Sequence, residues 1–149
     1  MKKYKNKGFT LVELVIVIAI VAILAAVLIP TFSGVVENAN KSAAMQEARN
    51  EYTKFLTDDS ANLDGGSYAI VVRDRYIFFV ENGAFQSTGY ALPSAAAAIA
   101  TVKVGAADVT ITGNSGAVPT ASEGYAATAV PAYGEQSEEI ALYRIAPSA

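Results

Sequence analysis

Apolar residues fill the first part of the 149-residue chain almost without interruption. Residues 14–29 are sixteen uncharged, apolar positions in a row, and the stretch from Phe9 to residue 29 is broken only by Thr10 and Glu13. At about 1.5 Å of rise per residue, a helix over this stretch is roughly 30 Å long, which is enough to cross the hydrocarbon core of a bilayer. The pattern therefore predicts a membrane-spanning helix over residues 9–30.

A different spacing follows in residues 31–56. Apolar side chains recur there mostly at steps of three and four, separated by charged and amide side chains, which predicts an amphipathic helix with one buried stripe. Between the two segments, Pro30 lacks an amide hydrogen and disfavours helical backbone at Ile29, and Gly34 weakens the helix further. We expect one long helix that kinks, loosens or restarts at Pro30, with a plain helix end at the membrane surface as the alternative.

The remaining residues, 57–149, carry the signals of an antiparallel sheet. The segments YAIVV (68–72) and YIFFV (76–80) are rich in β-branched and aromatic residues. Asp74 and Arg75 can form a tight turn between them, and Asn82-Gly83 is a strong hairpin signal. These features predict a three-stranded antiparallel meander, one face of which covers Tyr52 and Phe55 of the amphipathic helix. The aromatic side chains within it are expected in the core rather than in a ligand site: Tyr76, Phe78 and Phe79.

Further along the chain the signals are weaker. Residues 92–100, LPSAAAAIA, predict a short helix with Pro93 at its first position. The segments 103–113 and 139–146 predict two more strands, and residues 113–137 a long surface loop between them. The predicted fold class is α+β: a long N-terminal helix, half membrane-spanning and half amphipathic, packed against a small antiparallel β-sheet domain.

Charge orients the chain in the membrane. The first eight residues contain four lysines and no acid, so the positive-inside rule keeps the N-terminus cytoplasmic and sends the rest outward. Without these residues the chain has seven basic and fourteen acidic side chains, a formal net charge of −7. A body this acidic does not favour nucleic-acid binding, and we predict none.

The chemistry available to an active site is narrow. The chain has no histidine and no cysteine, so the usual proton shuttle, the thiolate nucleophile and the best zinc ligands are missing. No phosphate-binding glycine loop appears, and GNSG at 113–116 falls one residue short of a nucleophile elbow. The acidic segment 57–67 lacks the glutamate that an EF-hand requires, which favours a plain linker. We therefore predict neither an enzyme nor a bound metal or cofactor.

Three interpretations of the N-terminus compete. A secretory signal peptide is disfavoured because no A-x-A cleavage triplet follows the apolar run. An ordinary membrane anchor accounts for the lysines and the apolar residues, but gives no reason for a carboxylate at Glu13, which costs roughly 2.5 to 3.5 kcal/mol deep in a bilayer unless it lies near the wet membrane edge. The third interpretation is a short leader that is cut in front of a retained helix.

The segment KGFTLVELVIVIAIVAILAAVLIP, residues 7–30, resembles the N-terminus of type IV pilins and the related pseudopilins. In that family a prepilin peptidase cuts after the glycine that matches Gly8 and methylates the new amino terminus, which is Phe9 here. The resemblance implies that Glu13 attracts the amino terminus of an adjacent subunit during assembly. It also implies that the helix can lose helicity in the filament after the proline that matches Pro30.

The domain organisation follows from this resemblance and from the patterns together. We expect a cleaved leader over 1–8, an assembly helix over 9–30, an amphipathic helix over 31–56 and a β-rich domain over 57–149. The predicted function is that of a structural subunit of a type IV pilus. The alternatives are a pseudopilin or minor pilin of a type II secretion or DNA-uptake system, or a monomeric single-pass membrane-anchored binding domain.

The resemblance also implies partners and a location. The partners are further copies of the chain, the prepilin peptidase, and the assembly machinery, which consists of a membrane platform protein and an ATPase. The chain would be a single-pass cytoplasmic membrane protein before assembly and part of an extracellular pilus on the cell surface afterwards.

Overall fold

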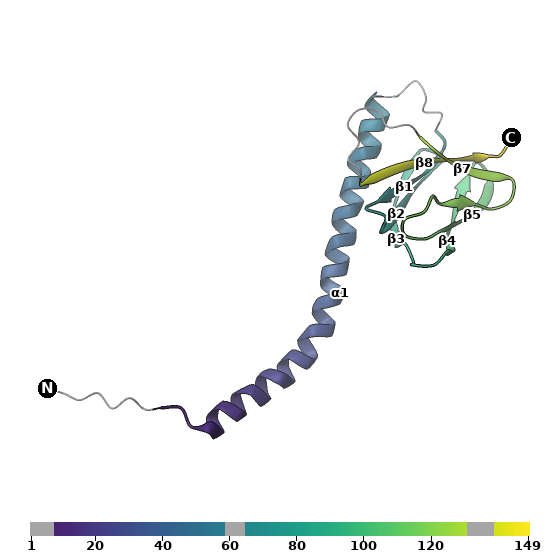
Figure 1. Cartoon of the computed structure of the whole chain (residues 1–149). Coiled ribbons are helices and arrows are strands. Elements are labelled where there is room, and N and C mark those ends of the chain that lie inside the picture. The colour runs from purple at the N-terminus through teal and green to yellow at the C-terminus, as the bar shows by residue number, and fades with distance from the viewer. Residues whose placement is uncertain (1–7, 59–64, 131–138) are drawn as a thin grey trace. The chain divides into compact units, whose positions relative to one another are not determined.

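The computed structural model describes residues 8–58, 65–130 and 139–149. Its chain divides into two compact units, residues 1–40 and residues 41–149. The described residues form one long helix and eight strands, arranged as Figure 1 shows. Their bounds are α1 Leu11–Asp58, β1 Ser67–Val72, β2 Tyr76–Glu81, β3 Ala84–Ala91, β4 Ala97–Val104, β5 Ala107–Gly113, β6 Thr120–Ala121, β7 Tyr125–Ala129 and β8 Ile140–Pro147. The predicted α+β class is confirmed.

Helix α1 is continuous through Pro30, so a restart or an end of the helix at this residue is wrong. Proline has no amide hydrogen, so the carbonyl four residues before it, Ala26 O, loses its helical donor. The hydroxyl of Thr31 donates to two carbonyls of the preceding turn, at 3.2 Å to Val27 O and 2.9 Å to Leu28 O. These bonds add to the hydrogen bonding of the turn before the proline, but they do not reach Ala26 O.

The predicted meander is confirmed, and it forms the centre of a larger sheet. Strands β1, β2 and β3 pair antiparallel in the five-stranded order β3-β2-β1-β8-β7. One face of this sheet packs against a stripe of α1 made by Ala44, Ala48, Tyr52 and Phe55. The small alanines bring the helix backbone close to the sheet, and the two aromatic residues fill the space beside Tyr68. The prediction that the meander covers Tyr52 and Phe55 is confirmed.

The opposite face of the same sheet is buried as well. A second antiparallel sheet, in the order β4-β5-β6, contributes Val102, Val109 and Ile111 to a cluster that includes Ile77 and Phe79. Because β1 and β2 lie between α1 and this second sheet, nearly all of their side chains are buried, whichever way they point. The core position predicted for Tyr76, Phe78 and Phe79 is confirmed, with Phe79 on the side of the second sheet.

The two tight turns of the meander have left-handed backbone. At the second turn, Asn82 (φ 48°) and Gly83 (φ 82°) confirm the predicted hairpin. At the first, the left-handed residues are Arg73 (φ 52°) and Asp74 (φ 50°), and the amide of Arg75 donates to Val72 O. The turn is therefore centred one residue earlier than the predicted pair, Asp74 and Arg75.

Three weaker predictions in the C-terminal half are wrong. Residues 97–100 belong to strand β4 rather than to a helix, because pairing with β5 overrides the helix propensity of the three alanines in this segment. Residues 103–113 are not one strand, since Gly105 (φ 60°) turns the chain between β4 and β5. Strands β6 and β7 lie within the predicted loop 113–137, the last residues of which fall outside the described part of the chain.

Hydrogen bonds of Asn82 and Ser67 join the two sheets to each other. The side chain of Asn82 donates to Gly105 O at 3.1 Å and accepts from the amide of Gly105 at 2.7 Å. Next to it, the fully buried Ser67 donates to Lys103 O at 2.6 Å and accepts from the amide of Asn82 at 3.1 Å. These bonds set the β2–β3 turn against the β4–β5 turn.

We expect Asn82→Ala to lower the free energy of unfolding of the 41–149 unit by about 1 to 3 kcal/mol. The change removes both bonds to Gly105 and forces alanine into left-handed backbone. Denaturant unfolding of the full chain in detergent micelles measures it. Asn82→Gly keeps the turn conformation and loses only the side-chain bonds, so it should cost less. Equal stability of wild type and Asn82→Ala would contradict a fastening role.

Candidate assembly site at the start of the helix

The predicted cleavage site lies before the helix. Gly8 and Phe9 have no regular secondary structure, α1 begins at Leu11, and the side chain of Phe9 is 86% exposed. A Cβ built on Gly8 would meet no atom within 4 Å, and its φ is not in the left-handed region. Neither packing nor backbone conformation requires glycine at this position. The local fold therefore gives no reason for Gly8, and leaves the bond to Phe9 open to an enzyme.

Helix α1 begins with a capping box formed by Thr10 and Glu13. The hydroxyl of Thr10 accepts from the amide of Glu13 at 3.2 Å, and the Glu13 carboxylate accepts from the amide of Thr10 at 2.9 Å. The Thr10 hydroxyl also donates to the same carboxylate at 2.7 Å. This reciprocal arrangement satisfies two amides that the first turn of a helix otherwise leaves unpaired.

Thr10 is the residue that the sequence interpretation missed. The signal was present, since threonine followed three residues later by glutamate, just before an apolar run, is the sequence pattern of a capping box. The consequence concerns Glu13, whose Oε2 atom takes both bonds from Thr10. Within the described residues Oε1 accepts no hydrogen bond, so half of the carboxylate stays available to a further donor.

We expect Thr10→Val to destabilise the first turn of α1 by about 1 kcal/mol, because valine keeps the shape of threonine but cannot cap. Amide hydrogen exchange of the full chain in detergent micelles measures the change at Leu11 to Glu13. Thr10→Ser retains the hydroxyl and should leave protection near the wild-type level. Unchanged exchange in Thr10→Val would contradict the capping role.

The unit formed by residues 1–40 displays a long apolar surface. Its large hydrophobic side chains are exposed from Phe9 to Val36. Helix α1 is long and apolar enough to cross a membrane. An apolar surface of this size needs lipid or protein around it, so this segment must be covered by a bilayer, by other copies of the chain, or by each in turn.

The four predicted site residues are therefore distributed over two places. Gly8, Phe9 and Glu13 lie together around the first turn of α1, whereas Pro30 lies inside the helix next to the Thr31 hydroxyl. No group of three or more potential metal-ligating side chains occurs among the described residues. Residues 59–64, the centre of the acidic segment 57–67, lie outside those residues.

Parts of the chain are similar to known proteins. Residues 3–29 match the prokaryotic N-terminal methylation motif. Over 62 residues, 42% of its length, the chain is 47% identical to the type IV wide pilus major component PilA4 of Thermus thermophilus. The match spans 45% of PilA4, less than half of that protein. No solved structure matches the chain. The resemblance to type IV pilins is thus confirmed.

Proposed function

We propose that the chain is a structural subunit of a type IV pilus. Prepilin peptidase removes residues 1–8 and methylates Phe9, and the mature chain polymerises through α1 into an extracellular filament. The observation that supports this most directly is the combination at the start of α1 of an exposed Gly8–Phe9 bond and a carboxylate, Glu13, with one oxygen unused.

The physical reason for polymerisation lies in the membrane. A carboxylate is costly in lipid, and the amino group of Phe9 on a neighbouring copy can neutralise it. That amino group does not exist until the bond after Gly8 is cut, so cleavage and assembly are linked. Before cleavage, the bonds from Thr10 reduce the cost of holding Glu13 in the membrane.

The capping bonds also determine which oxygen of the Glu13 carboxylate is free to bind a partner. Because Oε2 is held by the amide and hydroxyl of Thr10, Oε1 is the atom that can accept from an incoming ammonium group. A charge-assisted bond of this kind is shorter and stronger than a neutral one. Thr10 would thus act as a positioning residue for the assembly contact.

The remaining parts of the proposal concern location and partners. The chain is inserted in the cytoplasmic membrane before assembly, with its N-terminus inside, and resides in the surface filament afterwards. Its partners are copies of itself, the prepilin peptidase, and a platform protein with its ATPase. The 41–149 unit performs no catalysis and forms the exposed body of the filament.

Electron microscopy of filaments sheared from cells tests the proposal. Long fibres that contain this chain as their main component are the expected result, because the relative described above is a major pilus component. If the chain is absent from such fibres, or present only in traces, the pilus proposal fails in favour of a pseudopilin or a minor pilin. A chain that stays monomeric in the membrane would contradict the filament class altogether.

A further inference from the structure

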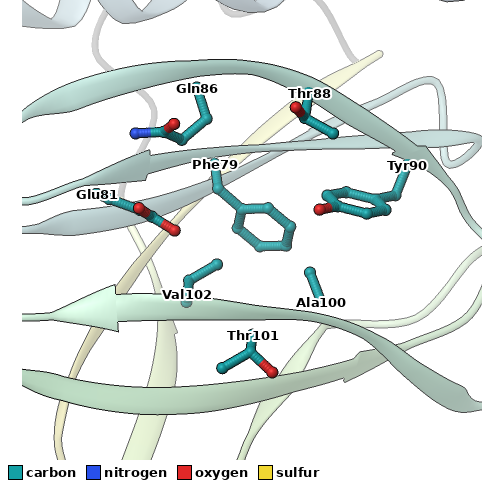
Figure 2. A pocket seen from close by; sticks show the side chains of 8 residues that line it. All are labelled: Phe79, Glu81, Gln86, Thr88, Tyr90, Ala100, Thr101 and Val102. Atoms are coloured by element: carbon teal, nitrogen blue, oxygen red, sulfur yellow. The ribbon is translucent and has the colours of Figure 1, made fainter.

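A polar pocket lies on the 41–149 unit, between strands β2 and β3 of the large sheet and strand β4 of the small one (Figure 2). It has a volume of about 90 Å³ and is open to solvent. The rings of Phe79 and Tyr90 form its floor, with centroids 6.0 Å apart. The polar side chains that line the pocket around these rings are Glu81, Gln86, Thr88 and Thr101.

The pocket is located where both edge strands are irregular. Strand β3 shifts its register against β2 between Phe78 and Val80, opposite the segment that carries Gln86 and Thr88. Strand β4 shifts against β5 between Ala98 and Ala100. Bulges of this kind redirect side chains and are frequent next to binding sites. Here both of them lie beside the same hollow, because Gln86, Thr88 and Ala100 line it.

The polar groups of the pocket are mostly acceptors. Glu81 is half-buried and takes part in no ion pair among the described residues, and no lysine or arginine lines the pocket. The amide nitrogen of Gln86 is used by Ala84 O at 3.2 Å, which leaves its oxygen as the free end. The hydroxyls of Thr88, Tyr90 and Thr101 can each accept a further hydrogen bond.

We propose that this pocket binds a primary ammonium group, supplied either by a small free amine or by a lysine of a second copy of the chain. Such a group carries three donors and a positive charge, which match the Glu81 carboxylate and the surrounding oxygens. The rings of Phe79 and Tyr90 add attraction for a cation near their faces. A neutral apolar ligand would leave these oxygens unpaired, and an anion would meet the charge of Glu81.

Titration of the full chain in detergent micelles tests the site without filaments, so it does not depend on the proposed function. The probe is N-acetyl-lysine methylamide, followed by amide chemical shifts, and the matched probe is the norleucine compound, which lacks the amine. We expect saturable shifts at Thr88, Tyr90 and Thr101 with the lysine probe alone. No shifts, or equal shifts with both probes, would overturn the proposal.

Variants titrated in the same way show whether binding depends on the charge of Glu81 or only on the shape of the pocket. Glu81→Gln should weaken binding of the lysine probe about tenfold or more, since a charge-assisted bond is lost. Tyr90→Phe, a second variant of the pocket, should weaken binding of the lysine probe less. It still gives a result if Glu81→Gln fails to fold. Glu123→Gln, an exposed acid outside the pocket, should bind like wild type. Wild-type affinity in Glu81→Gln would contradict the proposal.

Carbodiimide cross-linking of filaments assembled from two isotopically labelled pools identifies the source of the ammonium. A Glu81–lysine link between differently labelled copies supports a second copy as the donor, and saturable binding of the probe without such a link supports a free amine. A link confined to single copies would overturn the proposal, because the pocket would then be filled by its own chain. The cross-linking experiment rests on the proposed function because it needs filaments, whereas the titration does not.

Discussion

Glu13→Ala should insert into the membrane normally but fail to assemble into filaments. Insertion is not impaired, because removing a carboxylate from an apolar helix saves roughly 2.5 to 3.5 kcal/mol. Assembly loses the partner of the Phe9 amino group, which remains charged among apolar side chains. Breaking one side of a buried ion pair costs about 3 to 5 kcal/mol, or about two to four orders of magnitude in association. Membrane fractionation and sheared-filament yield measure the two effects separately.

The matched control for this variant is Glu13→Gln. Glutamine at this position still completes a capping box with Thr10, but carries no charge. If the ion pair is what matters, Glu13→Gln assembles as poorly as Glu13→Ala. If Glu13→Gln assembles like wild type, the role of Glu13 is to cap the helix, and the ion-pair interpretation is wrong. Glu37→Ala, an exposed acid further along α1, should have little effect on either measurement.

Phe78→Ala is expected to cost the 41–149 unit about 3 to 5 kcal/mol of stability. The Phe78 ring is fully buried, stacks on Phe85 at a centroid distance of 6.3 Å, and lies against the backbone of Gly89. Its removal leaves a cavity between α1 and the sheet. Since domains are stable by only about 5 to 15 kcal/mol, much of the margin would be lost. Near-ultraviolet circular dichroism of the tyrosines during denaturant unfolding measures it.

Gly89 provides a way to check this contact. A Cβ on Gly89 would lie 2.2 Å from the Phe78 ring, which is buried and cannot move aside, so Gly89→Ala should cost about 1 to 3 kcal/mol. In the Phe78→Ala background the added methyl enters the space that the ring left, and the two costs should not add. Additive costs would contradict the contact. Phe32→Ala, which alters an exposed ring of the 1–40 unit, should leave the transition unchanged.

The parts of the fold that the sequence predicted are those with strong local signals. A run of sixteen apolar residues needs no tertiary contacts to be recognised as a helix of membrane length. The Asn82-Gly83 turn and the two aromatic segments before it predicted the meander for a similar reason, because the turn chemistry and the strand propensities agree.

The second sheet was missed because its strands depend on their partners. Ala97 and Ala98 favour a helix when considered alone, and only the pairing of β4 with β5 makes them a strand. A signal for a second layer was present in β1 and β2, which are continuous apolar runs rather than alternating ones, as strands buried on both faces are. The continuity of α1 at Pro30 could not be predicted from periodicity, because a proline inside an apolar run is compatible with a kink, a restart or a continuous helix.

For the assembly site too, the sequence indicated some features and not others. The roles of Gly8, Phe9 and Glu13 in cleavage and assembly come from the resemblance of residues 7–30 to type IV pilins, and they stay predictions. Which oxygen of Glu13 is already used could not be predicted, since it depends on the conformation of the first helical turn. The pocket at Glu81 could not be predicted either, because it also needs β4, part of which the sequence predicted as a helix.

Mass spectrometry of the intact chain isolated from cells tests the proposed function most directly. A mature chain that begins at Phe9 and carries one methyl group on its amino terminus is the predicted result, because the neighbour's amino group must exist for Glu13 to be neutralised. A chain that still begins at Met1 when filaments are present would contradict it, and the explanation offered for Glu13 would fail with it.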